Sequence, residues 1–441
     1  MSIDGSLSEI FAKYGNFSQH FIHMSAEEAQ AVAVMHYGVS GQVRHLPTEK
    51  DDTFHIRCGP GHAFILKVEH PCEPAGDVVF QTALLDYLRD TAQDLNVPRV
   101  IRGGNGDAIV RHVDRAGQVR QVRLLSYLEG VPIEHIPSSA DGRRKIGVKL
   151  AQLRHGLAGF AHPGADRTLI WDVRCLPDLR ALLSFIDAPS HRARAETAMA
   201  RFVELLPAIA ALRTQILHND FNRSNILAVS RQDETIAGII DFGDALRTAI
   251  AIDVSTAMAN QLPLEVTSDA ATFLCAPRDV LRGYLNHADL MPEEVSMLGH
   301  LMMARLLLRA LISTWRAMVF PENRDYILRY SQVTWEQMTW FVERDVKTVS
   351  ETFMPDASIM GRNALARSPL PPSAWRMPSI QHRPPARTNG PMRILPDGSG
   401  CWGLPIACST AGRFRWIMAR VRTCMIVTIM NISTPTTMLH P

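Results

Sequence analysis

Short apolar runs alternate with polar turns in the first part of the chain, which is typical of a small sheet. These runs cover residues 43–46, 53–57 and 63–68, and polar or Gly/Pro-containing turns separate them. We therefore predict three successive strands. Apolar residues then recur at helical spacing from Val78 to Leu88, which predicts a helix after the third strand.

The later part of the chain changes to a helical period. After a strand-like run at 119–128, apolar residues recur on one helical face over 146–160, and most of 254–353 has the same character. The pattern predicts an α+β fold with a β-rich N-terminal lobe over 1–128 and a larger, mainly helical lobe over 129–353.

One predicted hairpin brings distant polar residues together. Apolar runs at 226–229 and 235–240 are separated by a short polar turn. An antiparallel return would place Asp241, which follows the second strand, beside the loop that enters the first strand. That loop carries Asp220 and Asn225.

These residue types suit phosphoryl transfer. The reaction needs a group that accepts the nucleophile's proton and oxygen ligands that hold a metal ion on the phosphates. We predict Asp220 as the catalytic base and Asn225 and Asp241 as ligands of Mg²⁺. His218 is expected to brace the loop, and Asp253 to cap a helix. The loop with Asp220 and Asn225, or the loop with Asp241, would by itself be taken for an ordinary loop. The prediction rests on their combination.

The two segments resemble the aminoglycoside phosphotransferase and choline kinase-like family, and within it hydroxylysine kinases and the kinase domains that precede class III aminotransferases. The resemblance covers roughly residues 20–350 and also rests on Tyr37-Gly38, Phe64-Ile65-Leu66-Lys67-Val68, Leu125-Ser126-Tyr127-Leu128-Glu129-Gly130, Trp171-Asp172 and Pro321-Glu322-Asn323. It implies a two-lobed protein kinase-like fold, with ATP or GTP as phosphate donor and Mg²⁺ as cofactor.

On the nucleotide side, the resemblance implies that Lys67 meets the phosphates from the third strand. Thr48, in the turn after the first strand, would cover them, although an ordinary polar turn would look the same. Protein kinases orient this lysine with a glutamate on the following helix, but here Gln81 occupies the corresponding place. Glu73 or Asp77 could substitute.

On the acceptor side, the resemblance implies the hydroxyl of an amino acid or amino alcohol, with 5-hydroxylysine favoured. Asp172 would bind its ammonium, and one of Arg305, Arg309 or Arg316 its carboxylate. Asp244 would reach Mg²⁺ or a substrate amine. An aminoglycoside, choline or homoserine acceptor and a nucleotide-binding pseudokinase remain alternatives. A protein kinase is disfavoured because no Ala-Pro-Glu follows the metal loop.

Composition limits the expected partners and cellular compartment. The 441 residues are 46% hydrophobic and carry a net charge of only +2, so no nucleic-acid partner is expected. The seven cysteines are scattered without a C-x-x-C pair, which favours a reduced, cytoplasmic compartment over a disulfide framework. We find no secretory signal and no apolar run approaching the ~20 residues of a membrane span.

The composition changes abruptly near residue 354. Residues 354–441 contain ten arginines, no lysine and only Asp356 and Asp397 as acids. Since the whole chain is +2 and this tail is +8, the rest is −6. Arg/Pro-rich sequence without apolar periodicity predicts a tail of low order. Its positive charge could also bind anionic partners, and a reading frame lost at a former fusion with an aminotransferase domain would explain the composition as well.

Overall fold

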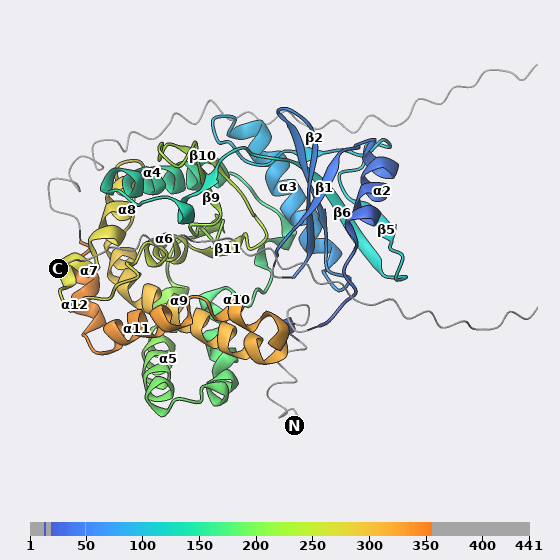
Figure 1. Ribbon diagram of the computed structural model, residues 1–441. Coiled ribbons are helices and arrows are strands. Elements are labelled where there is room, and N and C mark those ends of the chain that lie inside the picture. The colour runs from blue at the N-terminus through green and yellow to red at the C-terminus, as the bar shows by residue number, and fades with distance from the viewer. Residues whose placement is uncertain (1–12, 15–18, 49, 355–441) are drawn as a thin grey trace, which may run out of the picture. The chain divides into compact units, whose positions relative to one another are not determined.

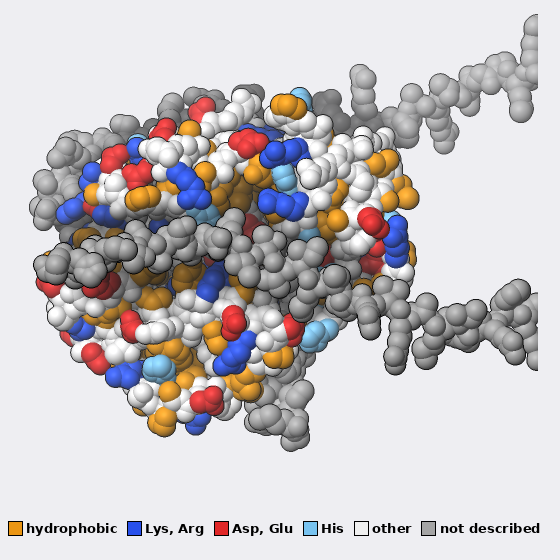
Figure 2. Space-filling model, viewed as in Figure 1, with side chains coloured by type: hydrophobic (Ala, Val, Ile, Leu, Met, Phe, Trp, Pro, Cys, Tyr) orange, Lys and Arg blue, Asp and Glu red, His pale blue; other side chains and the backbone are white. Residues whose placement is uncertain are grey.

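The computed structural model describes residues 13–14, 19–48 and 50–354 (Figure 1). All the elements below belong to one compact unit, residues 1–369. The predicted tail, apart from Met354, lies outside the described residues. On the face drawn in Figure 2, side chains of both charge signs are interspersed over the described helices.

The N-terminal region is built on a six-stranded antiparallel sheet, in the order β1-β2-β3-β6-β4, with β5 also on β6. The three predicted strands are confirmed. The strands are β1 (Gln42–Leu46), β2 (Asp52–Gly59), β3 (His62–Val68), β4 (Val100–Ile101), β5 (Val110–Val113) and β6 (Val119–Ser126).

Two helices flank this sheet in different ways. α2 (Ala26–Tyr37) packs Val32 and neighbouring alanines against Phe54 and Leu66 of the sheet, which forms a small core of its own. α3 (Ala75–Thr91) instead places Phe80 and Leu84 in the main core, together with residues of the helical region. α3 therefore joins the sheet to the rest of the unit.

The C-terminal region is mainly helical, as predicted. Its α-helices are α4 (Ala140–Leu157), α5 (Pro189–Ala210), α6 (Ile250–Ala259), α7 (Ala270–Phe273), α8 (Cys275–Leu285), α9 (Pro292–Val319), α10 (Arg324–Leu328), α11 (Ser331–Val342) and α12 (Val346–Glu351). Short 3₁₀ segments are η2 (Ile133–His135), η3 (Pro163–Asp166), η4 (Val173–Phe185) and η5 (Pro321–Asn323).

α9 runs through the middle of this region, in contact with α5, α6, α11 and α12. Among the described residues it is the one helix long and apolar enough to span a membrane, although 78% of its most apolar window is buried against the rest of the protein. This corrects the expectation that no such run exists. Arg305, Arg309 and Arg316 share one face of α9, because they are four and seven residues apart.

Two small strand pairs hold the central loops. β9 (Ile226–Ala228) and β10 (Ile236–Ile239) form the predicted hairpin, with β7 (Val131–Pro132) on its other side. The sequence did not reveal a second pair, β8 (Thr214–Leu217) with β11 (Leu246–Ala249). Since β8 leads into one central loop and β11 follows the other, this ladder fixes both loops at their outer ends.

Candidate active site

The hairpin brings the two polar segments together as predicted. The backbone N–H of Ile240 donates to the carbonyl of Asn225 at 2.9 Å, so Asp241 follows directly beside Asn225. Buried His218 bridges the same two segments, because its Nε2 lies 3.1 Å from the carbonyl oxygen of Ile240. Its Nδ1 accepts the N–H of Asp220 at 3.3 Å. His218 thus braces the loop.

Asp253 supports the loop from α6. It lies inside that helix, and its Oδ1 accepts the backbone N–H of Asn219 at 2.7 Å. The structural role expected for Asp253 agrees with this contact, although the carboxylate supports the loop before Asp220 instead of capping α6. Burial raises the pKa of Asp253 to about 6, although nearby His218 opposes the shift.

The backbone is strained at the same two places. Among the described residues, Asn219 (φ 61°) and Asp241 (φ 59°) are the only non-glycine residues with positive φ. Such conformations cost of order 1–3 kcal/mol each and cluster at functional sites. Gly243 follows closely, and a Cβ there would lie 3.0 Å from Oδ1 of Asp241. A side chain at position 243 would therefore crowd the Asp241 carboxylate.

Asp220 is held on both of its oxygens. Oδ2 accepts hydrogen bonds from the side-chain amides of Asn222 at 2.8 Å and Asn225 at 2.9 Å. Oδ1 accepts one from Arg305 at 2.8 Å, and the same guanidinium donates to the carbonyl of Trp171 at 2.6 Å. These contacts fix the orientation of a carboxylate whose side chain is 21% exposed.

Asn225 and Asp241 supply the kind of oxygen that Mg²⁺ prefers. Asn225 directs its NH₂ group to Asp220, so its amide oxygen is turned to the other side. The side chain of Asp241 is 54% exposed. Desolvation opposes its ionisation, yet the Lys67 ammonium keeps the pKa of Asp241 below its usual range. Within the described residues no cluster of three or more His, Cys, Asp or Glu could hold a metal. Mg²⁺ is commonly bound by one or two carboxylates together with water and the phosphates of a nucleotide, and Asn225 and Asp241 would suit such a site.

Lys67 lies between two carboxylates. Its Nζ is 3.4 Å from Oδ2 of Asp51 and 3.8 Å from Oδ1 of Asp241. Burial disfavours the ammonium, but these carboxylates, with Glu69, raise the pKa of Lys67 above its ordinary value. Lys67 is therefore fully charged at neutral pH.

Gln81 lies where protein kinases carry the lysine's glutamate, and its own contacts are with Arg123 and Gly243. Gln81 accepts a hydrogen bond from Arg123 at 2.7 Å and donates to the Gly243 carbonyl at 3.4 Å, so it supports the metal loop. The two proposed substitutes pair with other cations, Glu73 with Lys50 and Asp77 with Arg167.

Asp51 is the carboxylate that contacts Lys67, a role for which the sequence suggested Gln81, Glu73 or Asp77. It is buried just before β2, where the His70 N–H donates to its Oδ1 at 3.0 Å. Thr48 Oγ1 donates to the Asp51 carbonyl, which ties the turn after β1 to the same residue. Spacing on α3 could not have revealed this acid, because it comes from a turn in the sheet.

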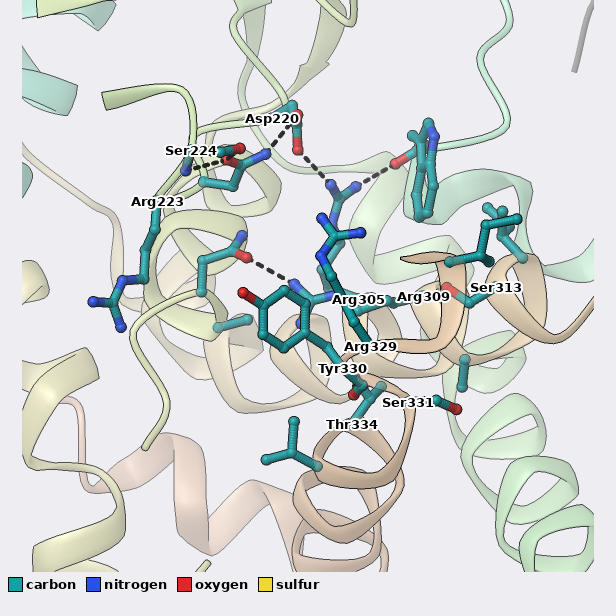
Figure 3. A pocket seen from close by; sticks show the side chains of 18 of the residues that line it. Asp220, Arg223, Ser224, Arg305, Arg309, Ser313, Arg329, Tyr330, Ser331 and Thr334 are labelled. Atoms are coloured by element: carbon teal, nitrogen blue, oxygen red, sulfur yellow. Dashed lines mark hydrogen bonds and ion pairs between the residues drawn. The ribbon is translucent and has the colours of Figure 1, made fainter. Parts of the chain in front are cut away.

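A cavity of about 360 Å³ extends from this site into the helical region (Figure 3). Thr48, Asp220 and Asp244 line one part of it. Its charged lining residues are five arginines and three acids, namely Arg223, Arg305, Arg309, Arg316, Arg329, Glu134, Asp220 and Asp244. In Figure 3 the side chains of Arg305, Arg309 and Arg329 point into the same space.

The two predicted substrate acids differ in position. Asp244 lines the cavity, where desolvation and the neighbouring Asp220 raise its pKa to about 7. Asp172 does not line it. Its buried carboxylate caps η4 through the Arg174 N–H at 3.0 Å and pairs with the Arg174 side chain. In this structure Asp172 therefore serves as a helix cap paired with Arg174, and its substrate role stays a prediction.

The model of the phosphotransferase enzyme family matches residues 46–290, which is more than half of the chain. The chain belongs to this family. The matched span contains Lys67, Asp220, Asn225 and Asp241, so the family match and the geometry concern the same site. It confirms the resemblance predicted from the sequence.

Hydroxylysine kinase from Bos taurus is 25% identical over 369 residues, covering 78% of this chain and 96% of that protein. A microcompartment-associated aminopropanol kinase aligns with a TM-score of 0.59 and 22% identity, over 74% of this chain and 99% of that one. Amicoumacin kinase, solved with AMP-PNP and Ca²⁺, aligns with a TM-score of 0.55 and 16% identity, over 78% and 99%. The kinase-like fold is confirmed, and the chain is a small-molecule kinase acting on hydroxyl groups.

Proposed function

We propose that this kinase transfers the γ-phosphate of ATP or GTP, as the Mg²⁺ complex, to a hydroxyl of an amino acid or amino alcohol, with 5-hydroxylysine as the leading acceptor. One observation carries the proposal. A single cavity joins Thr48 on the nucleotide side, the carboxylate of Asp220, and the arginines of α9. An acceptor in it would have its hydroxyl beside Asp220.

On the donor side, Lys67 would contact the phosphates while Asp51 holds its ammonium in place. Asn225 and Asp241 would hold Mg²⁺, which when bound neutralises charge on the phosphate oxygens. Thr48 lines the cavity from the turn after β1, where the phosphates would be covered. Charge neutralisation and positioning make up most of the catalysis in phosphoryl transfer.

On the acceptor side, the hydroxyl would donate a hydrogen bond to the Asp220 carboxylate. As the new O–P bond forms and the bond to the nucleoside diphosphate breaks, the hydroxyl proton passes to Asp220. Arg305 and the two asparagine amides hold that carboxylate still. A pseudokinase would require a damaged constellation, but Lys67, Asp220, Asn225 and Asp241 are all present.

The choice of 5-hydroxylysine rests on the similarity to hydroxylysine kinases at 22–25% identity. A panel with 5-hydroxylysine, choline, homoserine and kanamycin, each with ATP and with GTP, tests it through nucleoside diphosphate release. We expect the highest kcat/KM for 5-hydroxylysine. Equal or better use of choline would reject the amino acid acceptor and keep the kinase, whereas acceptor-independent nucleotide binding without turnover would support the pseudokinase.

A further inference from the structure

The acceptor end of the cavity is rich in cationic side chains with neutral partners. Of the three arginines that point into it in Figure 3, Arg305 forms an ion pair with Asp220. Arg309 instead donates to the neutral Oδ1 of Asn260 at 2.7 Å. Arg329 donates to the Tyr326 carbonyl at 2.7 Å. Two guanidinium groups therefore face the cavity while bonded to neutral oxygens.

Their surroundings favour an anion. The guanidinium of Arg329 lies 3.9 Å from the ring centre of Tyr326 and 5.0 Å from that of Tyr330, which leaves its edge available for hydrogen bonds. Desolvation and the adjacent Arg305 lower the pKa of Arg309 to about 10, and Arg329 contributes to the same effect. A ligand anion between these cations would relieve their mutual repulsion.

The spacing suits a hydroxyl and an anion on one small molecule. Arg305, which holds Asp220, and Arg309 are four residues apart on α9, or about 6 Å along the helix. We propose that Arg309 and Arg329 form a subsite for a carboxylate of the acceptor whose hydroxyl lies against Asp220. This inference rests on the proposed function and extends it to the substrate class: a hydroxy amino acid whose two groups are several bonds apart.

The test uses acceptors that differ only in the carboxylate. They are 5-hydroxylysine and 1,5-diaminopentan-2-ol, the diamine left when that carboxylate is removed. With the full chain, Arg309→Gln should lower kcat/KM for 5-hydroxylysine by roughly 10- to 100-fold, as expected for a lost charge-assisted hydrogen bond. For the diamine the change should stay below about threefold. Arg324→Gln, an exposed arginine of α10 outside the cavity lining, is the matched control.

Three outcomes are distinguishable. An equal loss on both acceptors would make Arg309 a structural residue and overturn the subsite. Equal kcat/KM of the wild type for both acceptors would also overturn the subsite. The protein would then still be a kinase of amino alcohols. Turnover of neither acceptor would reject the proposed acceptor, and the subsite would then be decided by binding.

The binding measurement needs no turnover. L-Lysine has the carboxylate without the hydroxyl, and cadaverine lacks both groups. Calorimetry should show that the wild type binds L-lysine at least roughly tenfold more tightly than cadaverine, and that Arg309→Gln removes most of this preference. Equal affinity of the wild type for the two amines would overturn the subsite.

Discussion

The nucleotide side and the acceptor side of the candidate active site balance their charges differently. On the nucleotide side each lysine has a carboxylate from the protein: Lys67 has Asp51 and Asp241, and Lys50 has Glu73. On the acceptor side Arg305 pairs with Asp220, whereas Arg309 and Arg329 bond to neutral oxygens. The two sides therefore differ in the charge that a ligand would have to bring.

The difference has a physical meaning. A buried cation paired with a carboxylate is fixed before any ligand arrives, because separating the two charges is costly. A cation bonded only to neutral groups keeps an attraction for an incoming anion. We infer that the lysines of the nucleotide side are fixed before the nucleotide binds. The arginines of the acceptor side would instead be neutralised by an anionic group of the acceptor.

The largest effect should come from breaking the ion pair between Arg305 and Asp220. Arg305→Gln should destabilise the protein by roughly 3 kcal/mol, because it leaves the carboxylate of Asp220 without this cation. Arg309→Gln should cost less than about 1 kcal/mol, since its partner is a neutral amide. Urea unfolding of both variants measures this contrast, and equal losses would contradict it.

A smaller effect is expected on the nucleotide side. Asp51→Asn should raise the KM for nucleotide by about tenfold, because Lys67 loses the buried carboxylate that holds its ammonium in place. A tenfold change corresponds to about 1.4 kcal/mol of nucleotide-binding free energy. The matched control is Asp86→Asn, which removes an acid paired with Arg89 and Arg102. Steady-state kinetics with saturating acceptor gives both values. An unchanged KM for Asp51→Asn would show that Lys67 is held by other contacts.

The smallest effect concerns Asp244 and pH. Its pKa is raised from 3.8 to about 7 in the folded chain, so the folded state binds an extra proton between these values and loses stability as pH rises through them. In the absence of divalent cations, Asp244→Asn should therefore raise Tm by about 2 °C at pH 8 and by almost nothing at pH 4. Thermal unfolding of both proteins between pH 4 and pH 8 measures this difference in Tm. A larger gain in Tm at pH 4 than at pH 8 would contradict the prediction.

The sequence predicted the parts of the site that depend on local order. The hairpin followed from two apolar runs, and it correctly placed Asp241 beside Asn225. Family resemblance and strand alternation likewise placed Lys67 on β3.

Contacts between distant segments could not be predicted. Asp51 reaches Lys67 from the turn before the neighbouring strand β2, and Arg305 reaches Asp220 from a helix 85 residues later. The pairing of Asp172 with Arg174 was not predicted either, although the two residues are close in the sequence. Partner choice among charged side chains depends on packing, which a single sequence does not display.

The central claim is that a hydroxyl acceptor meets Asp220 and the γ-phosphate in one cavity. Incubation of the full chain with γ-labelled ATP, Mg²⁺ and 5-hydroxylysine, followed by mass spectrometry of the small molecules, tests it most directly. We predict a labelled phosphate ester on the hydroxyl, formed roughly 10² to 10⁴ times more slowly by Asp220→Asn, which should still bind nucleotide. Ester formation at the wild-type rate by Asp220→Asn would contradict the claim.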